Sequence, residues 1–247
     1  MDQLDRLLST VGELLVSSKA AKIGEIGALF AVAWVVLRLG APFAGENPLA
    51  KQGVVWIANI LMLATVWLGL RLRGEGWAHL GLRRGVIHRR ALWGAVWRSL
   101  VVCAAAIASA AIGSIVGANL VGIPEQADLS GYNYLSGNLP MLILALLGVY
   151  VVSSFGEEVI YRGFLITRIA ELADGGKTAL RVAIIVSSVI FGLIHYEWGA
   201  MGMLQTGLMG LALAISYLMV KRNLWVLVLA HAYLDTVLLV QLYFAPQ

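Results

Sequence analysis

Seven apolar stretches constrain this chain more than any other feature. They are long enough to span a bilayer and cover roughly residues 24–39, 53–70, 92–121, 139–155, 182–195, 201–220 and 224–244. The chain is 60% hydrophobic and only 13% charged, so a soluble fold could not cover its surface with polar atoms. We therefore expect an all-α, polytopic helical membrane protein with about seven transmembrane helices. The fifth stretch is short, and the third is long enough to tilt.

The N-terminal 20 residues have a different pattern. Leucine and valine recur at helical spacing, with charged residues between them, at Leu4, Leu7, Leu8, Val11, Leu14 and Leu15. This pattern predicts an amphipathic helix on the membrane surface over residues 1–20. Transmembrane helices with a basic cytosolic loop would follow over residues 21–138. A helical core carrying the chemistry would occupy residues 139–247, within a single membrane domain.

The basic residues predict the orientation. They gather in alternate loops, at Arg71, Arg73, Arg83, Arg84, Arg89, Arg90, Arg98, Lys177, Arg181, Lys221 and Arg222. Because cytosolic loops are enriched in Lys and Arg, the N-terminus is expected in the cytosol and the C-terminus outside. The short chain is typical of a bacterial inner or plasma membrane protein. The net charge of +4 reflects this loop bias, and no basic surface interleaved with aromatics indicates nucleic acid.

Ionisable residues inside apolar stretches are candidates for catalytic groups, because inserting each one into a membrane costs about 2.5–3.5 kcal/mol of free energy. Glu157 and Glu158 are adjacent, and Glu158 can pair with Arg162 one helical turn later. That pairing would leave Glu157 free to act as a general base. His195 follows an aromatic residue by one turn, and His231 precedes an acidic residue by one turn, so three helices carry the groups that activate water.

Each of these features also has a structural interpretation. A Glu-Glu pair beside an arginine can simply end a span at the cytosolic interface. A single histidine in a span can serve as a hydrogen-bonding group between helices. The occurrence of all three elements in one chain favours a shared site. Glu157 falls near the inner end of the predicted span, so either that helix continues through Arg168 or the next one is tilted. We expect a cavity that opens towards the cytosol.

The three motifs together resemble a known family. Glu157-Glu158-x-x-x-Arg162, Phe191-x-x-x-His195 and His231-x-x-x-Asp235 match, in order and spacing, the motifs of the CAAX prenyl endopeptidase and bacterial Abi group, the CPBP intramembrane proteases. The resemblance covers roughly residues 139–240. It implies hydrolysis of a peptide bond in a membrane-associated protein or peptide.

The resemblance also implies roles for these residues. Glu157 and His195 would hold and activate water, and His231 and Asp235 would stabilise the oxyanion. Glu158 and Arg162 would support them. An ionised Asp235 would repel an oxyanion, so this residue must be protonated or must orient His231 instead.

Two alternatives stay open. Glu157, His195 and His231 could hold zinc or another divalent metal with an open coordination position, although no His-Glu-x-x-His helix is present. We expect no tightly bound cofactor. The second alternative is a catalytically silent membrane scaffold of the same fold. An ion-coupled carrier is disfavoured, because the chain shows no paired broken helices.

Small residues predict close helix packing. Gly113 and Gly117 lie in the third stretch, and Gly207, Gly210 and Ala214 lie in the sixth.

Overall fold

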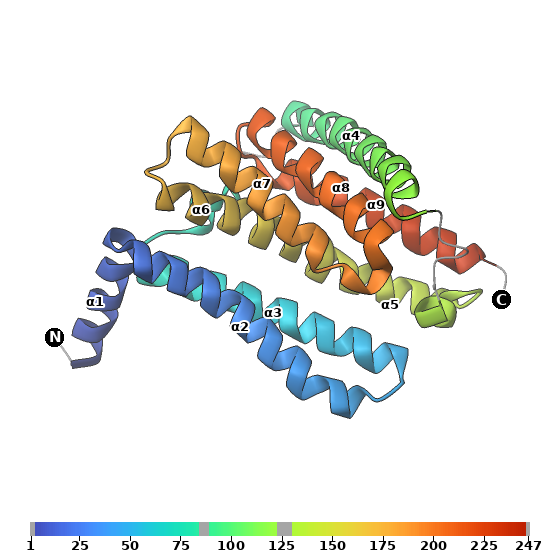
Figure 1. Ribbon diagram of the computed structural model, residues 1–247, viewed down its shortest axis with the longest axis horizontal. Helices are drawn as coiled ribbons and strands as arrows, with labels where there is room; N and C mark the ends of the chain where they lie inside the picture. The colour runs from blue at the N-terminus through green and yellow to red at the C-terminus, as the bar shows by residue number, and fades with distance from the viewer. Residues whose placement is uncertain (1–2, 84–88, 123–129, 246–247) are drawn as a thin grey trace.

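The computed structural model describes residues 3–83, 89–122 and 130–245 and is helical, with no strand in this part of the chain. The all-α expectation is therefore confirmed (Figure 1). The helices are α1 (Gln3–Ser17), α2 (Lys19–Ala44), α3 (Pro48–Leu72), α4 (Arg89–Val121), α5 (Leu139–Val149), α6 (Ile166–Leu172), α7 (Lys177–Leu193), α8 (Gly199–Met219) and α9 (Leu224–Phe244). Shorter or wider helical segments are η1 (Trp77–Leu80), η2 (Ser130–Leu135), η3 (Tyr150–Leu165) and η4 (Tyr196–Trp198).

Six helices in the described residues are long and apolar enough to cross a membrane. They are Lys19–Ala44, Pro48–Leu72, Leu92–Val121, Leu139–Leu172, Tyr196–Met219 and Leu224–Phe244. The stretch predicted at residues 182–195 lies in α7, which has only 17 residues and is not among the six. The protein is thus a multi-pass membrane protein, with six candidate spans in place of the expected seven. The predicted N-terminal helix forms as α1, and its position at the membrane surface stays a prediction.

The predicted span at residues 139–155 was too short. α5, η3 and α6 together form a helix of 34 residues, Leu139–Leu172. The predicted span ended at residue 155 because charged residues interrupt the apolar run after it, at Glu157, Glu158, Arg162 and Arg168. In the structure these side chains are largely or fully buried. Glu157 therefore lies in the middle of a long helix, as the first of the two alternatives above required.

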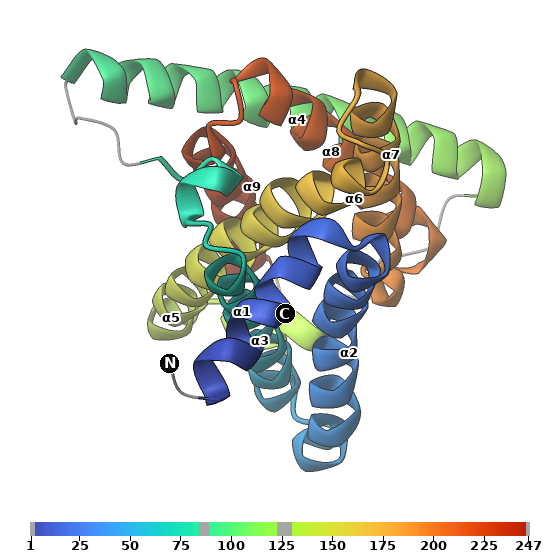
Figure 2. The same cartoon turned by 90° about the vertical axis from the view of Figure 1, so that its left-hand side faces the viewer.

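This long helix lies between the two parts of the bundle. The α2–α3 hairpin lies on one side, and α4, α7, α8 and α9 lie on the other (Figures 1 and 2). Within the second group, α4 packs against α8 and α9, and α7 packs against α8. η3 contacts α3, α7 and α9, so it is the segment on which helices from both parts converge.

Close approach of helices depends on glycine at several contacts. A Cβ added at Gly192 would lie 2.6 Å from the backbone oxygen of Met203 and 3.0 Å from the Cα of Gly207. A Cβ added at Gly113 would lie 2.8 Å from the Cα of Gln205. The predicted close packing at Gly113 and Gly207 is confirmed.

A buried ion network joins the hairpin to the long helix. Arg73 binds Glu25 at 2.7 Å and Glu171 at 3.3 Å, and Arg168 binds Glu75 at 2.6 Å and Glu171 at 3.0 Å. Both arginine side chains are almost fully buried. Arg73 was counted above among the cytosolic basic residues, and here it holds α3 against α2 and α6. Of the same basic group, Arg84 lies outside the described residues.

Candidate active site

The wide turns of η3 determine which of its side chains share a face. In a π-helix each N–H binds the carbonyl five residues earlier, so residues four and five apart point to the same neighbour. Ser153, Glu157 and Glu158 have this spacing, and all three side chains face His231 of α9. Such wide turns are frequent at functional sites.

The predicted pair of Glu158 and Arg162 is present. Arg162 Nη1 donates to Glu158 Oε1 at 2.9 Å, and the two side chains are 1% and 0% exposed. The guanidinium lies over the ring of Phe191, 4.1 Å from its centroid, which adds a cation–π contact. The pair is buried between η3 and α7 and does not end a span at the interface.

His231 is held between the two glutamates. Its Nδ1 lies 2.8 Å from Glu158 Oε1, an oxygen that also binds Arg162. A carboxylate paired with arginine accepts hydrogen bonds, so Nδ1 carries a hydrogen and donates it. The other nitrogen, Nε2, faces Glu157 Oε2 at 3.9 Å, Asp235 Oδ1 at 3.8 Å and Ser153 Oγ at 3.4 Å. Nε2 is therefore the atom available for chemistry.

Asp235 has one oxygen bound and one facing the site. The hydroxyl of Ser154 donates to Asp235 Oδ2 at 2.6 Å. Ser154 is fully buried and lies on η3, so this bond links η3 to α9 a second time.

His195 is fixed by its own helix and by two rings. Its Nδ1 lies 2.7 Å from the carbonyl oxygen of Phe191, which can only accept, so Nδ1 carries the hydrogen and Nε2 is left without one in the neutral form. The imidazole lies 4.9 Å from the ring centroid of Phe191 and 4.9 Å from that of Trp198.

The segment η2 contributes Tyr132 to the surroundings of His195 and Asp235. Burial raises the pKa of the Tyr132 hydroxyl, the indole of Trp198 opposes the rise, and the charges of Glu197 and Asp235 add to it. Since Trp198 and Asp235 both affect this pKa, Tyr132 lies close to Trp198 of η4 and to Asp235 of α9. Residues from four segments, η2, η3, η4 and α9, therefore lie around the site.

Five of the six predicted residues are linked by direct contacts. Glu157, Glu158, Arg162 and Asp235 surround His231 or bind one of its partners. His195 joins through Phe191, whose ring lies 6.4 Å from that of His231. The structure gives no direct contact between His195 and Glu157.

Ser153, Ser154 and Trp198 also contact these residues and were not predicted from the sequence. The two serines are adjacent polar residues in an apolar helix, one turn before the two glutamates, and that spacing was a readable signal.

Among the described residues, no three His, Cys, Asp or Glu side chains are arranged to hold a metal ion. Glu157, His195 and His231 do not form such a group, and zinc at these residues stays a prediction.

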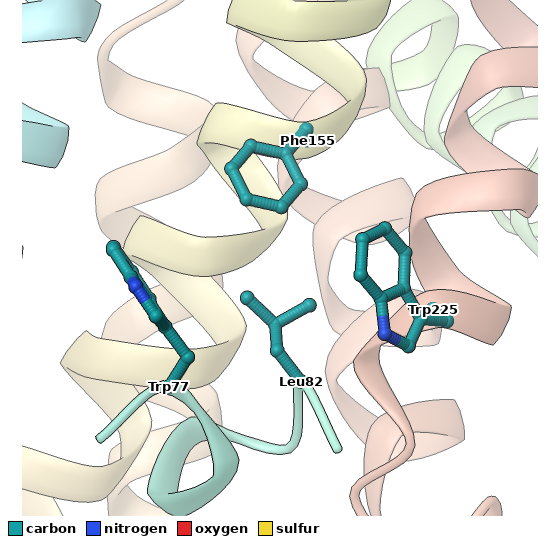
Figure 3. Close-up of a pocket in the computed structure, with 4 residues that line it drawn as sticks. All are labelled: Trp77, Leu82, Phe155 and Trp225. Atoms are coloured by element: carbon teal, nitrogen blue, oxygen red, sulfur yellow. The ribbon is translucent and has the colours of Figure 1, made fainter. Parts of the chain in front are cut away.

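The structure also contains an apolar pocket of about 210 Å³. Its lining side chains, Trp77, Leu82, Phe155 and Trp225, come from η1, the segment after it, η3 and α9, and they face a common space (Figure 3). The rings of Phe155 and Trp225 lie 6.0 Å apart. Phe155 and Trp225 belong to η3 and α9, the two segments that also carry Glu157 and His231.

The comparisons with known proteins agree with the motifs. The family model of the type II CAAX prenyl endopeptidase Rce1-like proteins matches residues 139–237, which confirms the resemblance. The matched range contains all six predicted site residues. Searches of the curated proteins and of the solved structures found no match.

Proposed function

Because residues 139–237 form a type II CAAX prenyl endopeptidase Rce1-like domain, we propose that this protein is an intramembrane endopeptidase that cleaves a membrane-associated protein or peptide. The family suggests intramembrane protease activity, and six apolar helices suit a substrate that reaches the enzyme from the bilayer. The observation that carries the proposal is the placement of His231 between Glu158 and Glu157, with a second imidazole nearby.

Glu157 is the proposed general base. Within the described part of the chain it pairs with no arginine, unlike Glu158, so its carboxylate can take a proton from water. The water oxygen attacks the carbonyl carbon, the C–N bond breaks, and the proton passes from Glu157 to the leaving amine. His195 accepts a hydrogen bond from the same water at Nε2, because its Nδ1–H is already bound to Phe191.

His231 is the proposed oxyanion donor. Since Nδ1–H is bound to Glu158, Nε2 can donate only when the ring is doubly protonated. Glu157 and Glu158 supply counter-charges for that form, and Asp235 supplies a third when it is ionised. Asp235 either donates to the oxyanion in its protonated form or holds His231 in place as a carboxylate.

The test of the proposal is Glu157→Gln, which keeps size and hydrogen bonding but cannot take a proton. Cleavage by the purified protein should fall at least ~100-fold, the usual scale for loss of a general base. The melting temperature should stay close to that of the wild type. The matched control is Glu46→Gln, because Glu46 is fully exposed and lies in a loop between two spans.

The outcome also separates the two hypotheses for this fold. A catalytically silent scaffold would keep its cellular phenotype in Glu157→Ala, whereas a protease would lose it. Cleavage by Glu157→Gln at near the wild-type rate would overturn the assignment of the base.

The metal question has its own prediction. If Glu157 and His195 activate water without a metal, prolonged chelation should leave the purified enzyme active. Elemental analysis should then find far less than one zinc per chain. Activity that is lost on chelation and restored by zinc would favour the metal alternative, with three protein ligands and one open position.

A further inference from the structure

The hydrogen bond between Ser154 and Asp235 joins two helices and also determines how the carboxyl group of Asp235 is oriented. Ser154 is fully buried, and its Oγ donates its single hydrogen to Asp235 Oδ2 at 2.6 Å. Asp235 Oδ1 points the other way and lies 3.8 Å from His231 Nε2. The two oxygens of one carboxyl group therefore have different environments.

We infer that Ser154 is a positioning residue, which occupies Oδ2 and so leaves Oδ1 as the atom that Asp235 presents to the reaction. The inference rests on the proposed function, in which Asp235 either donates to the oxyanion or holds His231. In both cases the acting atom is Oδ1, because Oδ2 is bound within the protein.

The same arrangement explains how an asparagine would work at this position. In Asp235→Asn, the amide oxygen can accept from Ser154 only if it takes the place of Oδ2. The NH₂ group then takes the place of Oδ1 and points at the site as a donor. Ser154 thus sets the orientation of the amide, and if Asp235 works in its protonated form, Asp235→Asn should keep much of the activity.

The contact itself is tested without any assay of cleavage. Full-length protein is labelled with ¹³C-aspartate, and the infrared spectrum of Asp235→Asn is subtracted from that of the wild type. The difference spectrum isolates the carboxyl band of Asp235. The band should shift in Ser154→Ala and should not shift in Ser188→Ala. Ser188 is a matched control, since it is buried and donates only to Ile184 of its own helix. An unchanged band in Ser154→Ala would overturn the inference even if the protein proves not to be a protease.

The role is tested by kinetics on the same variants. Ser154→Ala should lower kcat roughly tenfold with KM little changed, since small misplacements of a reacting group have effects of this order. In the Asp235→Ala background, Ser154→Ala should cause no further loss of the residual rate. Equal losses in both backgrounds, or a raised KM with kcat unchanged, would show that Ser154 acts through packing alone.

Discussion

Arg162 has three neighbours, each of which uses a different property of the side chain. Its charge pairs with Glu158, its planar face lies on Phe191, and its Nη2 reaches the carbonyl of Gly210. Removing it leaves Glu158 as a buried carboxylate with only His231 as partner. Arg162→Ala should therefore lose on the order of 3–5 kcal/mol of stability, the usual cost of breaking a buried ion pair. Thermal unfolding in detergent measures this loss.

Two further variants sharpen the Arg162 experiment. His195→Ala should lower activity while leaving the melting temperature nearly unchanged, because the histidine is only half-buried and binds its own helix. Arg162→Lys keeps the charge but not the planar fork, so it should be intermediate in stability. An Arg162→Ala protein as thermostable as the wild type would contradict the reading of this pair as buried and structural.

The sequence predicted local contacts at this site but not distant ones. The spacing of Glu158 and Arg162 predicted their pairing, which is confirmed. The second partner of Glu158 is His231, 73 residues away on α9. That contact depends on the relative position and rotation of α9 and η3, which the periodicity of the sequence does not determine. The bond from Ser154 to Asp235 was missed for the same reason.

At the scale of elements, the backbones of α7 and α8 approach each other closely at Gly192. The Cβ added at Gly192 would lie 2.6 Å from a backbone oxygen, so an alanine there must push the helices apart. Gly192→Ala should lose about 1–3 kcal/mol, as overpacking usually does. It should also lower activity, since Phe191 and His195 move with α7. Melting temperature and cleavage rate check both effects.

Gly53→Ala is the matched control for Gly192→Ala. Gly53 lies inside α3, and a Cβ added there would meet nothing within 4 Å. The control should be neutral or slightly stabilising, because alanine is the better helix former. If both variants melt like the wild type, the α7–α8 contact is looser than the structure indicates.

Helix type and length were harder to predict than helix existence. Apolar runs located every long helix, yet they ended the central one at residue 155 when it continues to Leu172. Hydropathy counts each charged side chain as a cost. It does not register that Arg162 is paired with Glu158 of its own helix, or that Arg168 is paired with Glu75 of a neighbouring segment. The π-helical turns of η3 have no signature in periodicity at all.

At the scale of the whole molecule, the bundle has two chemically different ends. Lys19 pairs with Asp174 at 3.6 Å, and Leu224 N–H binds the carbonyl of Gly81, so these loops gather at one end. At the other end Gly137 N–H binds the carbonyl of Tyr243. Basic loop residues concentrate at the first end, which contains Arg71, Arg73, Lys177, Arg181, Lys221 and Arg222.

The positive-inside rule predicts that this basic end faces the cytosol. Cys103 is the single cysteine of the chain, so Cys103→Ser gives a background in which Lys177→Cys and Lys51→Cys each introduce one thiol. Both lysines are exposed and lie at opposite ends of the bundle. An impermeant maleimide added to intact cells should label Lys51→Cys at once, and Lys177→Cys only after the membrane is opened. The reverse pattern would place the basic end outside. The apolar pocket, lined partly by Trp77 and Leu82 near that end, would then be reached from the outer face.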